Sequence, residues 1–146
     1  CPGGHICYYK FMLSLFPQLL DFGLLGPLFL RIGLAAVFIA HGYPKLFKKE
    51  GFLGAAQFFE SINIKPGKFW VIFVGIVEFF GGILLFVGLF TQAVALLLAF
   101  DMLIAIWKVK RHKGLVNGYE FDLILLLSAL ALAVLGAGAY ALDLPL

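Results

Sequence analysis

The sequence predicts an all-α integral membrane protein: a four-helix bundle with a short amphipathic interfacial helix between helices 1 and 2. Of the 146 residues, 63% are hydrophobic and only 13% are charged, whereas about a quarter of the residues of a soluble domain are charged. A chain this short cannot bury such an apolar surplus in one core, so the surplus must face lipid. Four apolar runs have the length of a spanning helix, about 20 residues. They are continuously apolar, unlike the alternating strands of a barrel.

The order of the elements follows from these runs. Between Gly88 and Gln92 the second and third runs leave room only for a tight hairpin outside the bilayer. The connection 44–68 is longer, and apolar residues recur within it at helical spacing over 51–60. This spacing predicts an amphipathic helix on the membrane surface, which ends before the turn signal at Pro66. The four predicted spans cover about 24–43, 69–90, 91–107 and 121–140.

These spans predict one membrane domain over 23–143, preceded by an N-terminal tail over 1–22. Residues 1–11 show no apolar spacing, and the residues from Met12 onward look like an ordinary beginning. We therefore interpret 1–11 as non-native, from a fragment or a start codon placed too early. Cys1 and Cys7 consequently receive no role.

Basic residues predict the orientation. Lysines cluster in the first loop, from Lys45 to Lys68, and in the third, from Lys108 to Lys113. Four spans place these loops on one side, and the positive-inside rule then puts loops 44–68 and 108–120 in the cytoplasm and both termini outside. Neither basic stretch carries a base-reading motif, so the predicted partner is the lipid bilayer and not nucleic acid.

Three charged residues fall at mid-bilayer depth in the spans, and a fourth, Asp122, lies near the start of the last span. Charges at mid-bilayer each cost about 2.5–3.5 kcal/mol on insertion scales, so they need partners. Counting helical rise places Arg31, Glu78 and Asp101 at similar depths. We expect an ion pair between Arg31 and one carboxylate, with the other carboxyl protonated or hydrogen-bonded. Two roles stay open and are compatible: structural bonding between helices, or a polar pocket that binds a quinone head group or passes a proton.

A second polar cluster is predicted at the cytoplasmic face, where the first span ends and the fourth begins. It comprises His41, Lys45, Tyr119 and Glu120. A histidine titrates near neutral pH and suits acid–base work, although a single histidine at a helix end also serves as a simple hydrogen-bonding group. No metal site is expected, because the histidines are scattered without a pair at one-turn spacing. Glycines within the spans are expected to let helices approach closely; they are Gly33, Gly75, Gly81, Gly82, Gly136 and Gly138.

Several motifs, taken in order, resemble the DoxX family of small membrane proteins over about Leu30 to Asp143. They are LRIGLAAVFIAHGYPKLF, GFLGAAQFFESINIKPG, GIVEFFGGILLFVGLFTQ and NGYEFDLILLLSALALAVLGAGAYALD. Gln92 departs from the basic residue of many relatives. The resemblance implies a four-helix fold in the cytoplasmic membrane, and some members resemble subunits of a thiosulfate:quinone oxidoreductase. The matching polar positions are Arg31, His41, Lys45, Glu78, Tyr119, Glu120 and Asp143.

The expected function is a redox-linked, quinone-associated membrane subunit that works with a partner enzyme. No covalently bound cofactor is expected, and the sequence leaves open whether the chain itself is catalytic. The alternative is a non-enzymatic anchor or assembly partner, whose basic loops dock a cytoplasmic protein or anionic lipid. A protein partner or a second copy of the chain is therefore expected beside the bilayer. A small transporter formed by oligomerisation ranks last, because one four-helix unit offers little room for a pathway.

Overall fold

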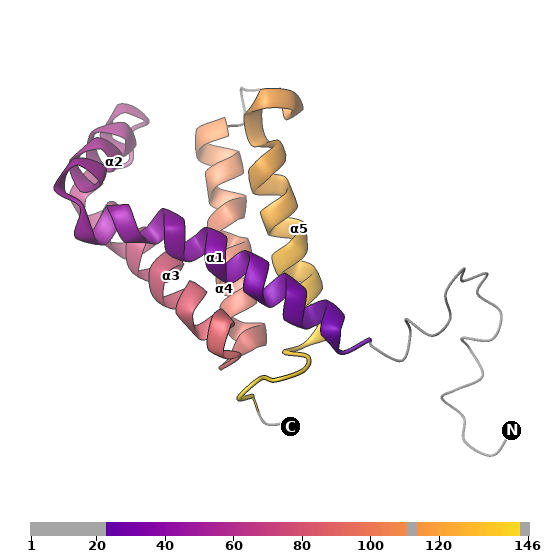
Figure 1. Cartoon of the computed structure of the whole chain (residues 1–146). Coiled ribbons are helices and arrows are strands. Elements are labelled where there is room, and N and C mark those ends of the chain that lie inside the picture. Colours follow the sequence, from indigo (N-terminus) through magenta and orange to yellow (C-terminus); the bar gives the residue numbers. More distant parts are fainter. Residues whose placement is uncertain (1–22, 111–113, 144–146) are drawn as a thin grey trace, which may run out of the picture.

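The computed structural model describes residues 23–110 and 114–143, and within this part the chain forms helices and turns and no strand (Figure 1). The expectations for residues 1–11, Cys1 and Cys7 lie outside the described residues. In order, the elements are α1 (Leu25–Phe47), α2 (Lys49–Ser61), α3 (Gly67–Val87), α4 (Thr91–Ile104), η3 (Ala105–Lys110), η4 (Leu115–Tyr119) and α5 (Glu120–Leu135).

Four stretches of the described chain are long and apolar enough to cross a membrane, so the predicted all-α, four-span fold is confirmed. They are Leu25–Phe47, Gly67–Val87, Thr91–Val109 and Leu115–Leu135. The helix expected between the first two spans is α2. The third span is α4 extended by the π-helical turns of η3, and the fourth is α5 with the bent segment η4 before it.

Two span ends differ from the sequence prediction. The first helix continues through Pro44, which lacks only one N–H donor, and its last turn packs against Gly75 of α3. The fourth helix ends at Leu135 because Gly136 and Gly138 have φ angles of +80° and +71°. Glycine adopts such left-handed angles without steric cost and so ends a helix. The residues that follow are apolar, so hydropathy alone does not mark this end.

The four spans form two pairs, α1 with α3 and α4 with α5 (Figure 1). The pairs meet where the α3–α4 turn, the start of α1 and the segment 136–143 lie together, which we call the hairpin end. They diverge toward the opposite end, where α2 lies beside α1 and α3. We call this the α2 end. The core between the pairs is formed by small and branched residues, including Leu34, Ala35, Leu98, Ala99 and Ala129.

Glycines hold α1 and α3 close together. A Cβ atom added at Gly42 would lie 2.5 Å from the backbone nitrogen of Phe79, and one at Gly82 would lie 2.8 Å from Ile39 Cγ1. Both distances are below van der Waals contact, so only glycine fits. Gly33, by contrast, faces open space. The expected role of glycine in close helix approach is thus found in the α1–α3 pair, whereas Gly136 and Gly138 act in the turn after α5.

Candidate functional site

Arg31 does not pair with Glu78 or Asp101 as expected. It is 1% exposed, and its guanidinium donates hydrogen bonds to three carbonyl oxygens of the segment after α5. The donor–acceptor distances are 2.9 Å to Ala137, 3.3 Å to Ala139 and 3.1 Å to Tyr140. These carbonyls are free to accept because Gly136 has ended the helix.

The geometry of α1 explains this correction. Helical side chains lean toward the N-terminus of their helix, and arginine is long enough to carry its charge toward the membrane surface. Arg31 therefore reaches the hairpin end, where a Cβ added at Gly88 would contact its guanidinium. Glu78 lies ten residues before Gly88 (88 − 78) on a continuous helix, which is about 15 Å of helical rise. The similar depths expected for Arg31, Glu78 and Asp101 were counted from backbone positions and did not include the length of the arginine side chain.

Asp143 completes the hairpin end. Its carboxylate accepts hydrogen bonds from the backbone N–H groups of Phe90, at 2.5 Å, and of Thr91, at 2.7 Å, where α4 begins. Its own N–H donates to the carbonyl of Gly88 at 2.8 Å. Desolvation raises the pKa of Asp143. The lowering effects are together larger, and they come from the Thr91 side chain, these backbone N–H groups and the charge of Arg31. The net pKa therefore lies below its ordinary value of 3.8. We call Arg31 together with segment 136–143 the C-terminal clasp.

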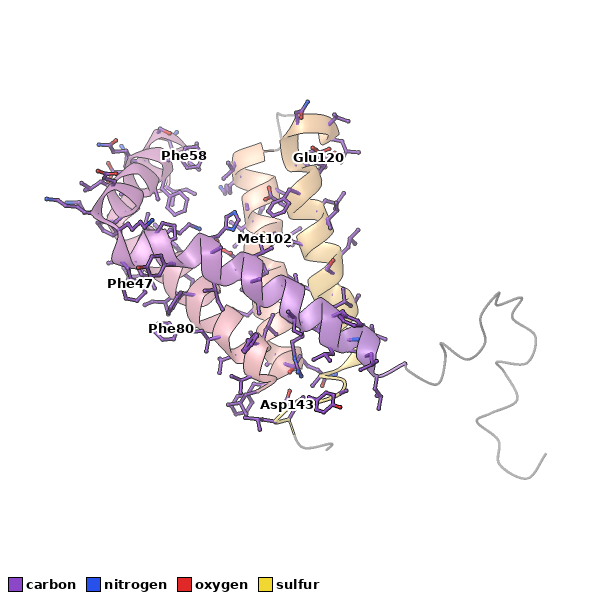
Figure 2. All side chains as sticks on the ribbon, in the orientation of Figure 1. Phe47, Phe58, Phe80, Met102, Glu120 and Asp143 are labelled. Carbon is purple, nitrogen blue, oxygen red and sulfur yellow. The ribbon has the colours of Figure 1, made fainter. Side chains whose placement is uncertain are left out.

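At the other end of the bundle, a cavity of about 590 Å³ lies between the two helix pairs. Its walls come from α1, α2, α3, α4 with η3, and α5. Most of the lining is aliphatic or aromatic, and Figure 2 shows Phe58 of α2 on the side that faces α4, opposite the end that holds Asp143. A largely apolar cavity with a few polar groups is the usual form of a small-molecule site. The polar lining residues are His41, Lys45, Glu78, Asp101, Lys108 and Asp122.

An ion pair between Lys45 and Glu78 joins α1 to α3 in the wall of the cavity. The Lys45 Nζ to Glu78 Oε2 distance is 2.5 Å, and the two side chains are 22% and 5% exposed. The pair forms because α1 continues past Pro44 and keeps Lys45 on the helix face that carries Phe38 and Gly42. A lysine assigned by sequence to the cytoplasmic face thus partners a carboxylate assigned to the bilayer interior.

Asp101 of α4 and Asp122 of α5 bring further carboxyl groups to this wall. Asp101 lies within electrostatic range of Glu78, Lys45 and Asp122. Its Oδ2 atom is buried and has no hydrogen-bond partner among the described residues. Buried polar atoms are normally bonded to protein or to a bound molecule, so this oxygen marks a position where a ligand group or water is expected.

The second expected cluster is divided by the fold. His41 lines the cavity; its ring lies 6.0 Å from that of Phe121, and its Nδ1 is 2.9 Å from the carbonyl oxygen of Val37. Tyr119 and Glu120 are not part of the lining. Glu120 instead accepts a hydrogen bond from the Asn117 N–H at 3.2 Å, across the bend that precedes α5. His41 and Lys45 therefore join Glu78 and Asp101 in one site.

Sequence reasoning placed Asp122 only near the start of its span and gave it no site role. Its position relative to Leu125 and Ala129, three and seven residues on, is the signal that could have found it, because this spacing puts all three on the buried face of α5. No signal pointed to backbone carbonyls as the partners of Arg31. Among the described residues, no group of three or more His, Cys, Asp or Glu could hold a metal ion.

The fold and the site together define a multi-pass membrane protein whose helices enclose an apolar cavity with ionisable groups in its wall. The family model described as DoxX matches residues 26–111. The chain is 37% identical over 119 residues to "Putative oxidoreductase CatD" of Bacillus subtilis, covering 82% of this chain and 85% of that protein. It is 34% identical over 121 residues to "Inner membrane protein YqjF" of Escherichia coli, covering 81% of this chain and 89% of that protein. No solved structure matches significantly.

The chain therefore belongs to the DoxX family.

Proposed function

We propose that the cavity binds the head group of a membrane quinone, and that the protein is a quinone-linked subunit beside a partner enzyme. The observation that supports this most is the cavity itself, in which the Lys45–Glu78 pair and Asp101 face otherwise apolar walls. A quinone has the matching form, with polar oxygens on a ring that carries an apolar tail. The name of the Bacillus subtilis relative, "Putative oxidoreductase CatD", agrees with a redox role.

The polar groups suit the chemistry of a quinone. Reduction of a quinone to its quinol takes up electrons and protons, so the site must supply hydrogen bonds and protons close to the ring oxygens. Lys45 would donate a hydrogen bond to one ring oxygen, while Asp101 and His41 would exchange protons. The electrons would come from the partner enzyme, and the residues of this chain would bind, orient and protonate the ring.

The proposed orientation places loops 44–68 and 108–120 in the cytoplasm and both termini outside. The lysines of these loops support it through the positive-inside rule. The α2 end of the cavity would then lie toward the cytoplasm, which is the side of a soluble partner enzyme. A C-terminal fusion to a reporter that is active only in the cytoplasm should stay inactive. An active reporter would reverse the orientation.

The two tryptophans of the chain allow a direct binding test. Trp70 lines the cavity, whereas Trp107 is 61% exposed and does not. In phosphatidylcholine nanodiscs, a decyl-tailed benzoquinone should quench Trp70 saturably in a Trp107→Phe protein. In a Trp70→Phe protein it should quench Trp107 only in proportion to its concentration in the lipid. Glu78→Gln should weaken the saturable component, and equal, unsaturable quenching of both tryptophans would refute the proposal.

Exposed lysines support the alternative function, a non-enzymatic anchor. Lys48 and Lys49 lie on the surface where α1 passes into α2, beside a second, smaller hollow that Phe47 and Phe52 also line. Such a basic, partly apolar surface could dock a cytoplasmic protein, a second copy of the chain or anionic lipid. Mild-detergent purification should then recover a stoichiometric partner that Lys48→Gln/Lys49→Gln releases. Retention of that partner by the double variant would count against docking at this surface.

A further inference from the structure

We propose that the ligand reaches the cavity from the hydrocarbon core of the bilayer, through an opening between α3 and α4, and that its tail stays in that opening. This inference rests on the proposed function and deepens it. It makes the ligand an amphipathic molecule with a hydrocarbon tail. We call the opening the lateral portal and define it by Trp70 and Phe73 of α3 and Leu97, Phe100 and Ile104 of α4.

The α4 side of the portal belongs both to the cavity and to the outer surface of the bundle. Leu97, Phe100 and Ile104 line the cavity, yet they are 46%, 59% and 39% exposed. Their spacing of three and four residues places them in one stripe along the helix. Large side chains that line a cavity and keep this much accessible surface are expected where the cavity opens between two helices. We therefore take this stripe as the α4 edge of the opening.

The α3 side has the same character. Trp70 and Phe73 line the cavity and are 39% and 49% exposed, while the next turn carries Val77 and then buried Glu78. Polarity therefore rises from the outer edge inward: aromatic and aliphatic groups at the surface, the Lys45–Glu78 pair behind them. A ligand seated with its head on the ion pair would leave its tail between these two stripes.

The portal is closed at the hairpin end and open toward α2. Near the hairpin, Gly81 lets α4 approach so closely that an added Cβ would lie 3.3 Å from Leu98 and 3.5 Å from Val94. Further along, α3 and α4 present large side chains to each other, and α2 adds Phe58 and Phe59 to the lining. Gly81 thus allows close contact in one part of the α3–α4 pair, and bulky side chains border the other part.

The chemistry of the edge selects a ligand dissolved in lipid. The five portal residues carry no charge, and both helices that bear them are spans. A hydrated polar molecule would lose its water on passing between these rings without gaining hydrogen bonds. An alkyl or isoprenoid tail pays no desolvation penalty there, because the apolar side chains of the portal resemble the lipid that the tail leaves.

The portal can be narrowed without touching the polar groups. Leu97→Phe/Ile104→Phe adds bulk to the portal stripe of α4. Leu96→Phe/Leu103→Phe is its matched control, because those two residues have the same spacing and are 54% and 48% exposed but do not line the cavity. Both pairs are made in the Trp107→Phe protein, so that quenching of Trp70 reports binding in nanodiscs. The probes are the decyl-tailed benzoquinone and its tail-free parent.

We expect the portal variant to weaken binding of the tailed probe about tenfold relative to the control, which corresponds to the loss of a few buried methylenes. Binding of the tail-free probe should change less than about twofold, because the head-group site is intact. Equal losses for both probes, or no loss for either, would overturn the portal while leaving quinone binding in place. If the parent protein showed no saturable quenching by either probe, the proposed function itself would fall, and the portal with it.

Discussion

The hairpin end and the α2 end of this bundle treat buried charge in opposite ways. At the hairpin end, Arg31 has three backbone carbonyls as acceptors and Asp143 has two backbone N–H donors, so the chain supplies its own partners. At the α2 end, the Lys45–Glu78 pair stands in the wall of a cavity, and an oxygen of Asp101 has no partner among the described residues.

Under the proposed function, this difference separates charge that holds the fold together from charge that would serve a ligand. A charge that is bonded mainly to backbone groups of its own chain holds helices together, although Arg31 Nε has no hydrogen-bond partner among the described residues. A charge beside open volume is expensive in a membrane and is kept where it has a use. Figure 2 places Asp143 at the first end and Phe58 at the second, so the two roles lie at opposite ends of the molecule.

Loss of the C-terminal clasp should have the largest effect on stability. Arg31→Leu leaves three carbonyl oxygens without their donor, and we expect the free energy of unfolding to fall by about 3 kcal/mol. Arg31→Lys should recover part of this loss, because an ammonium keeps the charge but has fewer donors. Unfolding titrations in mixed detergent–SDS micelles measure both variants. Wild-type stability in Arg31→Leu would contradict the clasp.

Breaking the Lys45–Glu78 pair should cost less, because Lys45 is partly exposed. Lys45→Met or Glu78→Met alone leaves an unpaired charge and should lower the free energy of unfolding by about 2 kcal/mol. The double variant removes both charges and should lower it by less than either single change. The same titrations give the coupling energy. Strictly additive losses would show that the two side chains do not interact.

Packing of the α1–α3 pair provides the next test. Gly42→Ala places a methyl group against the backbone of Phe79, and we expect a loss of about 1–2 kcal/mol from overpacking. Gly33→Ala on the same helix meets no atom within 4 Å, and it should stabilise the protein by about 0.5–1 kcal/mol. Thermal unfolding of both variants in detergent compares them. Equal effects of the two variants would mean that helix propensity, and not the contact with Phe79, determines the change in stability.

The smallest expected effect is a pH dependence at the clasp. Because the native pKa of Asp143 lies below its ordinary value of 3.8, unfolding takes up a proton in acid. The contribution of Asp143 to stability is therefore complete above this value and is lost as the pH falls through the lower native pKa. Melting temperatures recorded across this range should converge for wild type and Asp143→Asn at the acid end. A constant difference between them would argue against an ionised Asp143.

The sequence was sufficient to predict the four spans and α2, because continuous apolarity and helical spacing are local properties. It could not predict the segment after Leu135, since that segment is as apolar as the helix before it. It also separated Lys45 from Glu78, because the apolar run of the first span ends at Tyr43 and the charge of Lys45 assigns it to the cytoplasmic face. The partners of Arg31 are backbone carbonyls, which every sequence contains, so nothing in the residue types announces them.

The clasp also sets the order in which the protein can be completed. Arg31 enters the membrane with the first helix, but the carbonyls that accept its hydrogen bonds belong to residues 106 to 109 positions later in the chain. Until the ribosome has released that last stretch, the nascent first helix carries a guanidinium without its final acceptors. Synthesis through Tyr140 is thus required before the first helix has its hydrogen-bond acceptors, and a chain cut short after Leu135 would lack all three.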